Sequence, residues 1–151
     1  MITALIIESN ESDFLRIKSS LFLHSSDIEL CNVATLADGL VKIAAHKYDL
    51  VLVDIHLPDS NGVETIKELK AATDVPIVVL ADNDDEVMIV ESIKAGAFNY
   101  LHKSETNGNL RRAILVAKAK SDLRKEKRVK IMDMINKYLP VKEEQELINN
   151  I

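Results

Sequence analysis

Two carboxylates and one ammonium group stand directly after short apolar runs in this 151-residue chain. Glu8 follows the first run, Asp54 the third and Lys103 the fifth. Magnesium binds proteins through one or two carboxylates together with water and substrate oxygens. A carboxylate can also attack phosphorus to form an acyl phosphate, and a lysine can neutralise the additional anionic oxygens. These residue types therefore suit a site for a metal ion and a phosphoryl group, provided that the fold brings them together.

The elements that would position these residues alternate five times between apolar runs and helical periodicities. Apolar residues at helical spacing separate the runs, and a fifth helix begins near Leu110. Runs that are apolar on both faces are typical of parallel strands covered by helices on both sides. We therefore predict an open, doubly wound α/β sheet whose binding crevice lies at the carboxyl ends of the strands. The predicted strands cover residues 4–7, 28–34, 50–53, 76–80 and 100–102.

Composition and charge limit the classes of protein that the chain can represent. An apolar fraction of 47% and a charged fraction of 28% predict one well-filled core and argue against a disordered chain. The single Cys31 excludes an intramolecular disulfide framework. No run approaches the ~18–20 apolar residues of a membrane span, and the N-terminus lacks the basic region of a signal peptide. We therefore expect a soluble, cytoplasmic protein.

Several segments resemble, in order and spacing, the receiver domain of two-component response regulators. Val51–Pro58 followed by Asn61-Gly62 is similar to the phosphoacceptor segment of that family. Later family motifs are matched by Pro76–Leu80, Lys94–Ala97 and Tyr100–Lys103. This resemblance covers roughly residues 3–120. It implies a flavodoxin-like (βα)5 sheet with strand order 2-1-3-4-5, and a signalling module for phosphorelay rather than an enzyme.

The resemblance also implies roles for individual residues. Asp54 would accept a phosphoryl group from a histidine kinase or a phosphotransfer protein, and Lys103 would be the counter-ion of that group. Mg²⁺ would be bound by Glu8, by Asp54 and by the backbone carbonyl of His56. Tyr100 corresponds to a residue whose side-chain rotamer reports activation near the output face of the family.

Two positions depart from the family pattern. Ser9 stands where receivers have a second acid that ligates the metal directly, and its neutral oxygen predicts weaker magnesium binding. Ala81 stands where they have a switch Ser or Thr, whose hydrogen bond to a charged group contributes about 1.5–3 kcal/mol. Two interpretations therefore remain: a receiver phosphorylated on Asp54, or a pseudo-receiver that binds partners independently of phosphorylation. A phosphatase with an aspartyl nucleophile is disfavoured, because His56 occupies the position of its second aspartate.

The helical pattern continues beyond the part that resembles a receiver. We predict a receiver domain over residues 1–122 and a helical extension or linker stub over 123–151. Residues 118–130 carry seven basic and two acidic side chains without an aromatic residue, which favours a solvated helix face over a nucleic-acid site. Output is expected through the fourth helix, the fifth strand and the fifth helix. A homodimer through this face or through the C-terminal helix, and a link to an output domain or target protein, are the alternatives.

Overall fold

The computed structural model describes residues 1–22, 27–105 and 108–138. The chain divides into two compact units, Met1–Lys118 and Ala119–Ile151. The first unit holds every strand, and all residues that the sequence predicts for the site belong to it.

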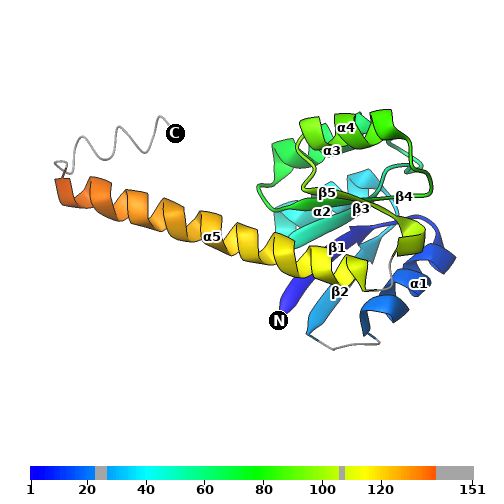
Figure 1. The fold of residues 1–151 in the computed structure, drawn as a ribbon, viewed down its shortest axis with the longest axis horizontal. Helices are drawn as coiled ribbons and strands as arrows, with labels where there is room; N and C mark the ends of the chain where they lie inside the picture. Colours follow the sequence, from blue (N-terminus) through cyan, green and yellow to red (C-terminus); the bar gives the residue numbers. More distant parts are fainter. Residues whose placement is uncertain (23–26, 106–107, 139–151) are drawn as a thin grey trace. The chain divides into compact units, whose positions relative to one another are not determined.

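A five-stranded parallel sheet forms the centre of the first unit (Figure 1). Its spatial order is β2-β1-β3-β4-β5, and each neighbouring pair is parallel. The doubly wound α/β fold and the strand order 2-1-3-4-5 are therefore confirmed. The strands are β1 (Ile2–Ile7), β2 (Ile28–Val33), β3 (Leu50–Asp54), β4 (Ile77–Ala81) and β5 (Asn99–His102).

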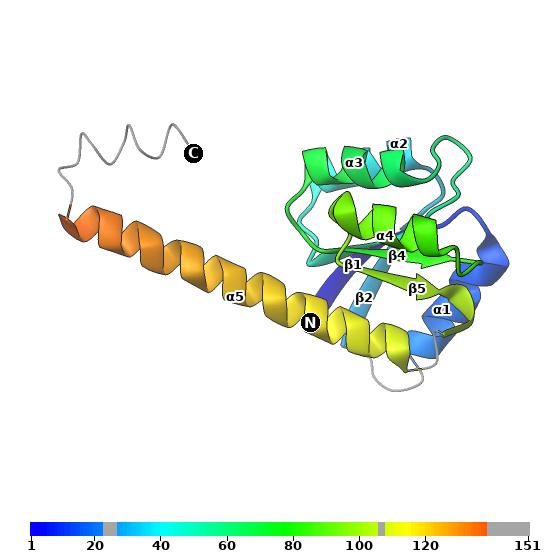
Figure 2. The same ribbon diagram turned by 45° about the horizontal axis from the view of Figure 1, so that its top comes forward.

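Helices cover both faces of this sheet, as Figures 1 and 2 show. One apolar cluster joins alternate strand residues to α2, α3 and α4, and a second joins the intervening residues to α1 and the beginning of α5. Successive side chains of a strand point to opposite faces of the sheet. A strand that is apolar throughout therefore contributes side chains to both clusters. The helices are α1 (Glu11–Phe22), α2 (Leu36–Ala45), α3 (Val63–Ala72), α4 (Glu86–Lys94) and α5 (Asn109–Tyr138), with a short 3₁₀ helix η1 (Lys103–Glu105) after β5.

The starts of three helices follow local signals in the sequence. Thr35 caps α2 by accepting a hydrogen bond from the Asp38 N–H at 3.1 Å. Asp85 caps α4 and accepts from the two N–H groups at positions 87 and 88. Gly62 precedes α3 with φ +68°, a conformation that side chains with a Cβ rarely adopt. These caps fix where the loops after β2, β3 and β4 end.

The apolar residues at helical spacing in α4 face solvent. Val87 is 71% exposed, and Val90 and Ile93 are also exposed. The buried side chain of this helix is Ser92, and Met88 packs partly against the core. Periodicity alone thus predicted the helix but not the side that it buries.

The fifth helix is longer than a receiver-like fold needs. Its first turns bury Leu110, Ala113, Ile114 and Ala117, as the spacing predicts. The helix continues to Tyr138, and Ile131 is exposed. Residues 139–151, the rest of the predicted extension, lie outside the described residues. In the described ranges, no helix combines the length and the apolar character that crossing a membrane would require.

Replacement of Gly39 by valine should destabilise the first unit. A Cβ at this position of α2 would lie 2.5 Å from Cδ1 of Ile7, and Ile7 is fully buried in β1. Overpacking of this kind costs about 1–3 kcal/mol. Urea unfolding of Gly39→Val should show this loss, whereas Ala44→Val, at an exposed position of the same helix, should cost about 0.5 kcal/mol or less. Equal effects of the two substitutions would contradict close packing of α2 on β1.

Candidate functional site

The predicted site residues meet at the carboxyl edge of the sheet. Ile7 of β1 is paired with Val53 of β3. The next residues along the chain, Glu8 and Asp54, therefore lie next to each other at the carboxyl ends of these two strands. Lys103 follows β5 at the same edge and is the first residue of η1. The topology thus brings together three residues that the sequence separates by as much as 95 positions.

Lys103 is the centre of the site. Its Nζ atom donates to Glu8 Oε1 at 3.2 Å, to Asp54 Oδ2 at 3.1 Å and to Asp13 Oδ2 at 2.8 Å. Lys103 and Glu8 are each 2% exposed, and Asp54 is 6% exposed. A lysine ammonium has three donors, so these three carboxylates satisfy all of them. Such saturation is what allows a charged side chain to be buried at tolerable cost.

The protonation behaviour of Lys103 and Glu8 follows from this burial and pairing. Burial alone would lower the pKa of Lys103, but hydrogen bonds to Asp13 and Glu8 and the negative charge of Asp54 outweigh burial and raise the pKa. Lys103 is therefore positively charged at neutral pH. Burial raises the pKa of Glu8, the hydrogen bond from Lys103 opposes this effect, and the charge of Asp54 adds to it.

Asp13 is the residue of the site that sequence reasoning missed. It lies in the first turn of α1, where acidic residues are common because they favour the positive end of the helix dipole. The predicted site residues directly follow apolar runs, whereas Asp13 lies five positions beyond Glu8. Its side chain is 22% exposed. The available signal was an acid placed one helical turn from the strand end, in a chain that has Ser9 at the usual acidic position.

The loop after β3 is fastened by several hydrogen bonds. The backbone N–H of His56 donates to Asp54 Oδ1 at 3.0 Å. The imidazole Nδ1 of His56 lies 2.5 Å from Asn61 Oδ1. Asp59 accepts from the Leu36 N–H at 2.9 Å and from the next N–H of α2, and these bonds hold the pKa of Asp59 below its usual range. The Asp54 carboxylate is thereby oriented by its own loop.

His102 connects two loops beside the site. Its Nε2 donates to the carbonyl of Asp82 at 2.7 Å, and its Nδ1 accepts from the Ser104 N–H at 3.1 Å. Both ring nitrogens are therefore occupied, and His102 acts here as a link between the loops after β4 and β5. The exposed carboxylate of Asp82 lies 4.0 Å from Lys103 Nζ and adds negative charge at the mouth of the site.

The two predicted switch positions have different environments. Ala81 ends β4 and is fully buried, so this end of the strand presents a methyl group and no side-chain hydroxyl. The Tyr100 hydroxyl donates to Asn83 Oδ1 at 3.5 Å. Burial raises the pKa of Tyr100, as do the charges of Asp85 and Asp84. Tyr100 is thus tied to the loop after β4, although nothing in this contact assigns it a switching role.

The oxygen donors at the site are compatible with magnesium. Glu8 Oε2 lies 3.0 Å from Lys103 Nζ, but within the described part of the chain it has no hydrogen-bond partner and is buried. The Glu8 carboxylate lies beside Asp54, and a hard cation bound here would share it with Lys103. Ser9 is exposed and offers a neutral hydroxyl. The described residues contain no group of three or more His, Cys, Asp or Glu side chains arranged around a metal, and magnesium needs only one or two carboxylates.

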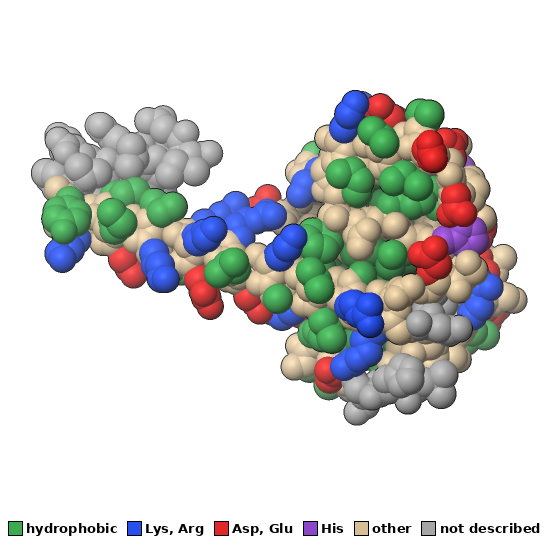
Figure 3. Space-filling model, in the orientation of Figure 1, with side chains coloured by type: hydrophobic (Ala, Val, Ile, Leu, Met, Phe, Trp, Pro, Cys, Tyr) green, Lys and Arg blue, Asp and Glu red, His purple; other side chains and the backbone are tan. Residues whose placement is uncertain are grey.

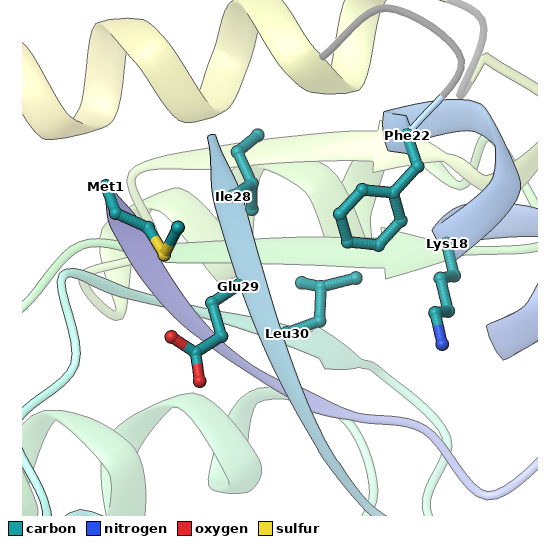
Figure 4. A pocket seen from close by; sticks show the side chains of 6 residues that line it. All are labelled: Met1, Lys18, Phe22, Ile28, Glu29 and Leu30. Carbon is teal, nitrogen blue, oxygen red and sulfur yellow. The ribbon is translucent and has the colours of Figure 1, made fainter. Parts of the chain in front are cut away.

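A separate pocket lies away from this site (Figure 4). It is formed around the beginnings of β1 and β2 and the end of α1, at the opposite edge of the sheet. None of its lining residues takes part in the cluster around Lys103. They are Met1, Lys18, Phe22, Ile28, Glu29 and Leu30.

Removal of the Lys103 ammonium should destabilise the protein strongly. Lys103→Met leaves three carboxylates close together without their cation, and loss of one partner from a buried ion pair costs about 3–5 kcal/mol. Chemical denaturation of the variant at neutral pH should show a loss of this size. Lys94→Met, at a side chain that is 70% exposed, is the matched control and should change stability by about 0.5 kcal/mol or less. A Lys103→Met protein as stable as this control would contradict the observed cluster.

Comparison with known proteins supports the interpretation of the fold. A family model described as the response regulator receiver domain matches residues 4–115. The chain is 33% identical over 119 residues to the KDP operon transcriptional regulatory protein KdpE of Escherichia coli, covering 78% of this chain and 51% of that protein. It is 32% identical over 112 residues to KdpE of Staphylococcus aureus, covering 74% of this chain and 48% of that protein. The chain thus spans about half the length of these curated relatives.

The solved structures give the same result. A response regulator receiver domain protein from Clostridium thermocellum has a TM-score of 0.73 and 25% identity, and the match covers 82% of this chain and 98% of that one. The matched family consists of signalling modules of two-component systems rather than of enzymes. With a family match over most of the first unit and a flavodoxin-like sheet in the expected order, the chain belongs to the response regulator receiver domain family.

Proposed function

We propose that this receiver domain accepts a phosphoryl group on Asp54 from the phosphohistidine of a histidine kinase or a phosphotransfer protein. Receiver domains partner with histidine kinases. An oxygen of Asp54 attacks phosphorus, and the P–O bond forms while the P–N bond breaks. The imidazole nitrogen leaves with the bonding electron pair and takes up a proton. The observation that carries the proposal is the buried contact of 3.1 Å between Lys103 Nζ and Asp54 Oδ2, because Lys103 can neutralise the phosphoryl oxygens.

The charge of the pocket explains why a metal ion is part of this proposal. Glu8, Asp13 and Asp54 surround the single ammonium of Lys103, so negative charge is in excess when the carboxylates are ionised. An incoming phosphoryl group adds further negative charge. Receiver domains typically bind Mg²⁺, and a divalent cation would offset this excess.

The residues proposed to hold Mg²⁺ are Glu8, Asp54 and the backbone carbonyl of His56. Glu8 supports this assignment through its buried Oε2, which has no hydrogen bond within the described ranges. The hydroxyl of Ser9 is a weak substitute for a carboxylate, so we expect magnesium to bind less tightly than at a site with two adjacent acids. Magnesium there would orient and neutralise phosphoryl oxygens.

The pseudo-receiver is the second candidate, and Ala81 is the observation that favours it. A fully buried methyl group at this position cannot hydrogen-bond a phosphoryl oxygen. Phosphorylation of Asp54 would therefore change the conformation of the loop after β4 less. In this alternative the same surface binds a protein partner whether or not Asp54 is phosphorylated.

The proposed output surface consists of α4, β5 and the part of α5 in the first unit. Val87, Val90 and Ile93 are exposed on α4, and Leu115 and Val116 are exposed on α5. Figure 3 shows hydrophobic side chains on this face. Solvent-exposed apolar side chains of this kind suit a homodimer interface or the docking of a target protein.

The remaining parts of the proposal concern the chain as a whole. Residues 1–122 are proposed as the receiver domain and residues 123–151 as an extension that leads to an output domain or pairs with a second copy. A cytoplasmic location is included, because receiver domains are usually cytoplasmic.

Phosphorylation of Asp54 can be tested on the intact protein. Incubation with Mg²⁺ and acetyl phosphate should add the mass of one phosphoryl group, because Asp54 is the proposed phosphoacceptor and its Oδ2 lies 3.1 Å from Lys103 Nζ. Asp54→Asn should remove this gain, and Asp59→Asn, in the same loop, should retain it. Intact-mass spectrometry at neutral pH checks all three proteins. A wild-type protein that never gains a phosphoryl group under these conditions favours the pseudo-receiver.

Introduction of a hydroxyl at position 81 should strengthen the coupling between the phosphoryl group on Asp54 and the loop after β4. Ala81→Ser supplies a donor that can bond a phosphoryl oxygen, and such a bond to a charged group contributes about 1.5–3 kcal/mol. Binding of beryllofluoride, a phosphoryl mimic, should therefore tighten by about tenfold or more, as measured by NMR titration in Mg²⁺. Ala97→Ser, at a buried position outside the site, is the control. Unchanged binding by Ala81→Ser would show that the missing hydroxyl does not limit coupling.

A further inference from the structure

We propose that Asp13 is a positioning residue that holds Lys103 in the unphosphorylated protein and releases it to the phosphoryl group, so that the pocket is coupled to α1. The proposal rests on the proposed function of Asp54. It assigns a role to Asp13, which belongs to none of the motifs named above for the resemblance.

The first step of the argument is the number of donors on Lys103. Its three N–H groups are taken by Glu8, Asp13 and Asp54. A phosphoryl group on Asp54 brings new anionic oxygens, and Lys103 can bond one of them only by giving up a present partner.

Of the two carboxylates that are not themselves phosphorylated, Asp13 can be given up at the lower cost. Its carboxylate is 22% exposed, whereas the side chain of Glu8 is fully buried and that of Asp54 is 9% exposed. An exposed carboxylate regains hydration when it loses a hydrogen bond, and a buried one does not. Asp13 also keeps a second cation, since its Oδ1 lies 3.2 Å from Nη2 of Arg16.

The exchange would be transmitted to α1. Asp13 lies in the first turn of this helix, and its own N–H donates to Asn10 Oδ1 at 2.9 Å. The contact with Lys103, at 2.8 Å, ties the beginning of α1 to the loop after β5. Loss of this contact removes the tie. Ala81 cannot supply a hydroxyl to the phosphoryl group. The route through α1 does not require one, because it runs through Lys103 and Asp13.

The charge of Asp13 acts in the same direction as the contact. A carboxylate beside Lys103 repels an incoming phosphoryl group and competes with it for the ammonium. Replacement by asparagine keeps the size and one oxygen acceptor but removes the negative charge. Asp13→Asn should therefore favour the phosphoryl-bound arrangement, whereas simple damage to the structure would weaken binding.

The test compares wild type, Asp13→Asn and Glu11→Gln by NMR titration with beryllofluoride in Mg²⁺. Glu11 is an exposed acid in the same turn of α1, so its variant removes the same charge without the contact. Asp13→Asn should bind beryllofluoride about fivefold or more tightly than wild type, and Glu11→Gln should stay close to wild type. The amide signals of Arg16 and Ile17 should shift on titration of wild type and shift less in Asp13→Asn.

Binding by Asp13→Asn that equals or falls below that of Glu11→Gln would overturn the proposal while leaving Asp54 as the phosphoacceptor. If wild type binds no beryllofluoride, the proposed function fails and the release step fails with it. A second measurement tests the contact between Asp13 and Lys103 in the unphosphorylated protein, independently of the release step and of phosphorylation. In urea unfolding, the effect of Asp13→Asn should largely disappear in a Lys103→Met background, and an unchanged effect would show that Asp13 does not hold Lys103.

Discussion

The buried ammonium of Lys103 among three carboxylates is the interaction on which the rest of the structure depends. A cation removed from water loses hydration worth several kcal/mol, and only saturated hydrogen bonding makes this tolerable. Lys103 reaches saturation because the residue after β1, the last residue of β3 and the first turn of α1 each supply one carboxylate at the same edge of the sheet. The strand order is thus a requirement of the site, since β1 and β3 must be neighbours for Glu8 and Asp54 to meet.

The same cluster determines what chemistry the pocket can support. It holds one ammonium group and an excess of carboxylates, which suits a divalent cation and a phosphoryl group better than a neutral ligand. Ala81 supplies no hydroxyl to this pocket, and Ser9 supplies no charge. Asp13 offers a connection, because it joins the pocket to a helix that lies on the opposite face of the sheet from α4.

Much of this arrangement could be predicted from the sequence, for physical reasons that particular residues illustrate. Runs such as Ile77–Leu80 are apolar on both faces, which only a sheet covered on both sides can bury. Capping residues such as Thr35 and Asp85 act within a few positions and are visible locally. Asp13 could not be predicted in this way, because it does not directly follow a strand and an acid in the first turn of a helix is ordinary. The side of α4 that faces solvent could not be predicted either. Apolar residues at helical spacing indicate that a helix has two different faces, but not which face packs against the core.

The most direct test of the account is the titration of the Lys103 side chain, followed by NMR of its Nζ or Cε in the intact protein. The account predicts a pKa clearly above the ordinary value for lysine, 10.5, because three carboxylates stabilise the charged form more than burial disfavours it. A pKa at or below that of a free lysine side chain would contradict it, since the ammonium could not then be held by Glu8, Asp13 and Asp54 together.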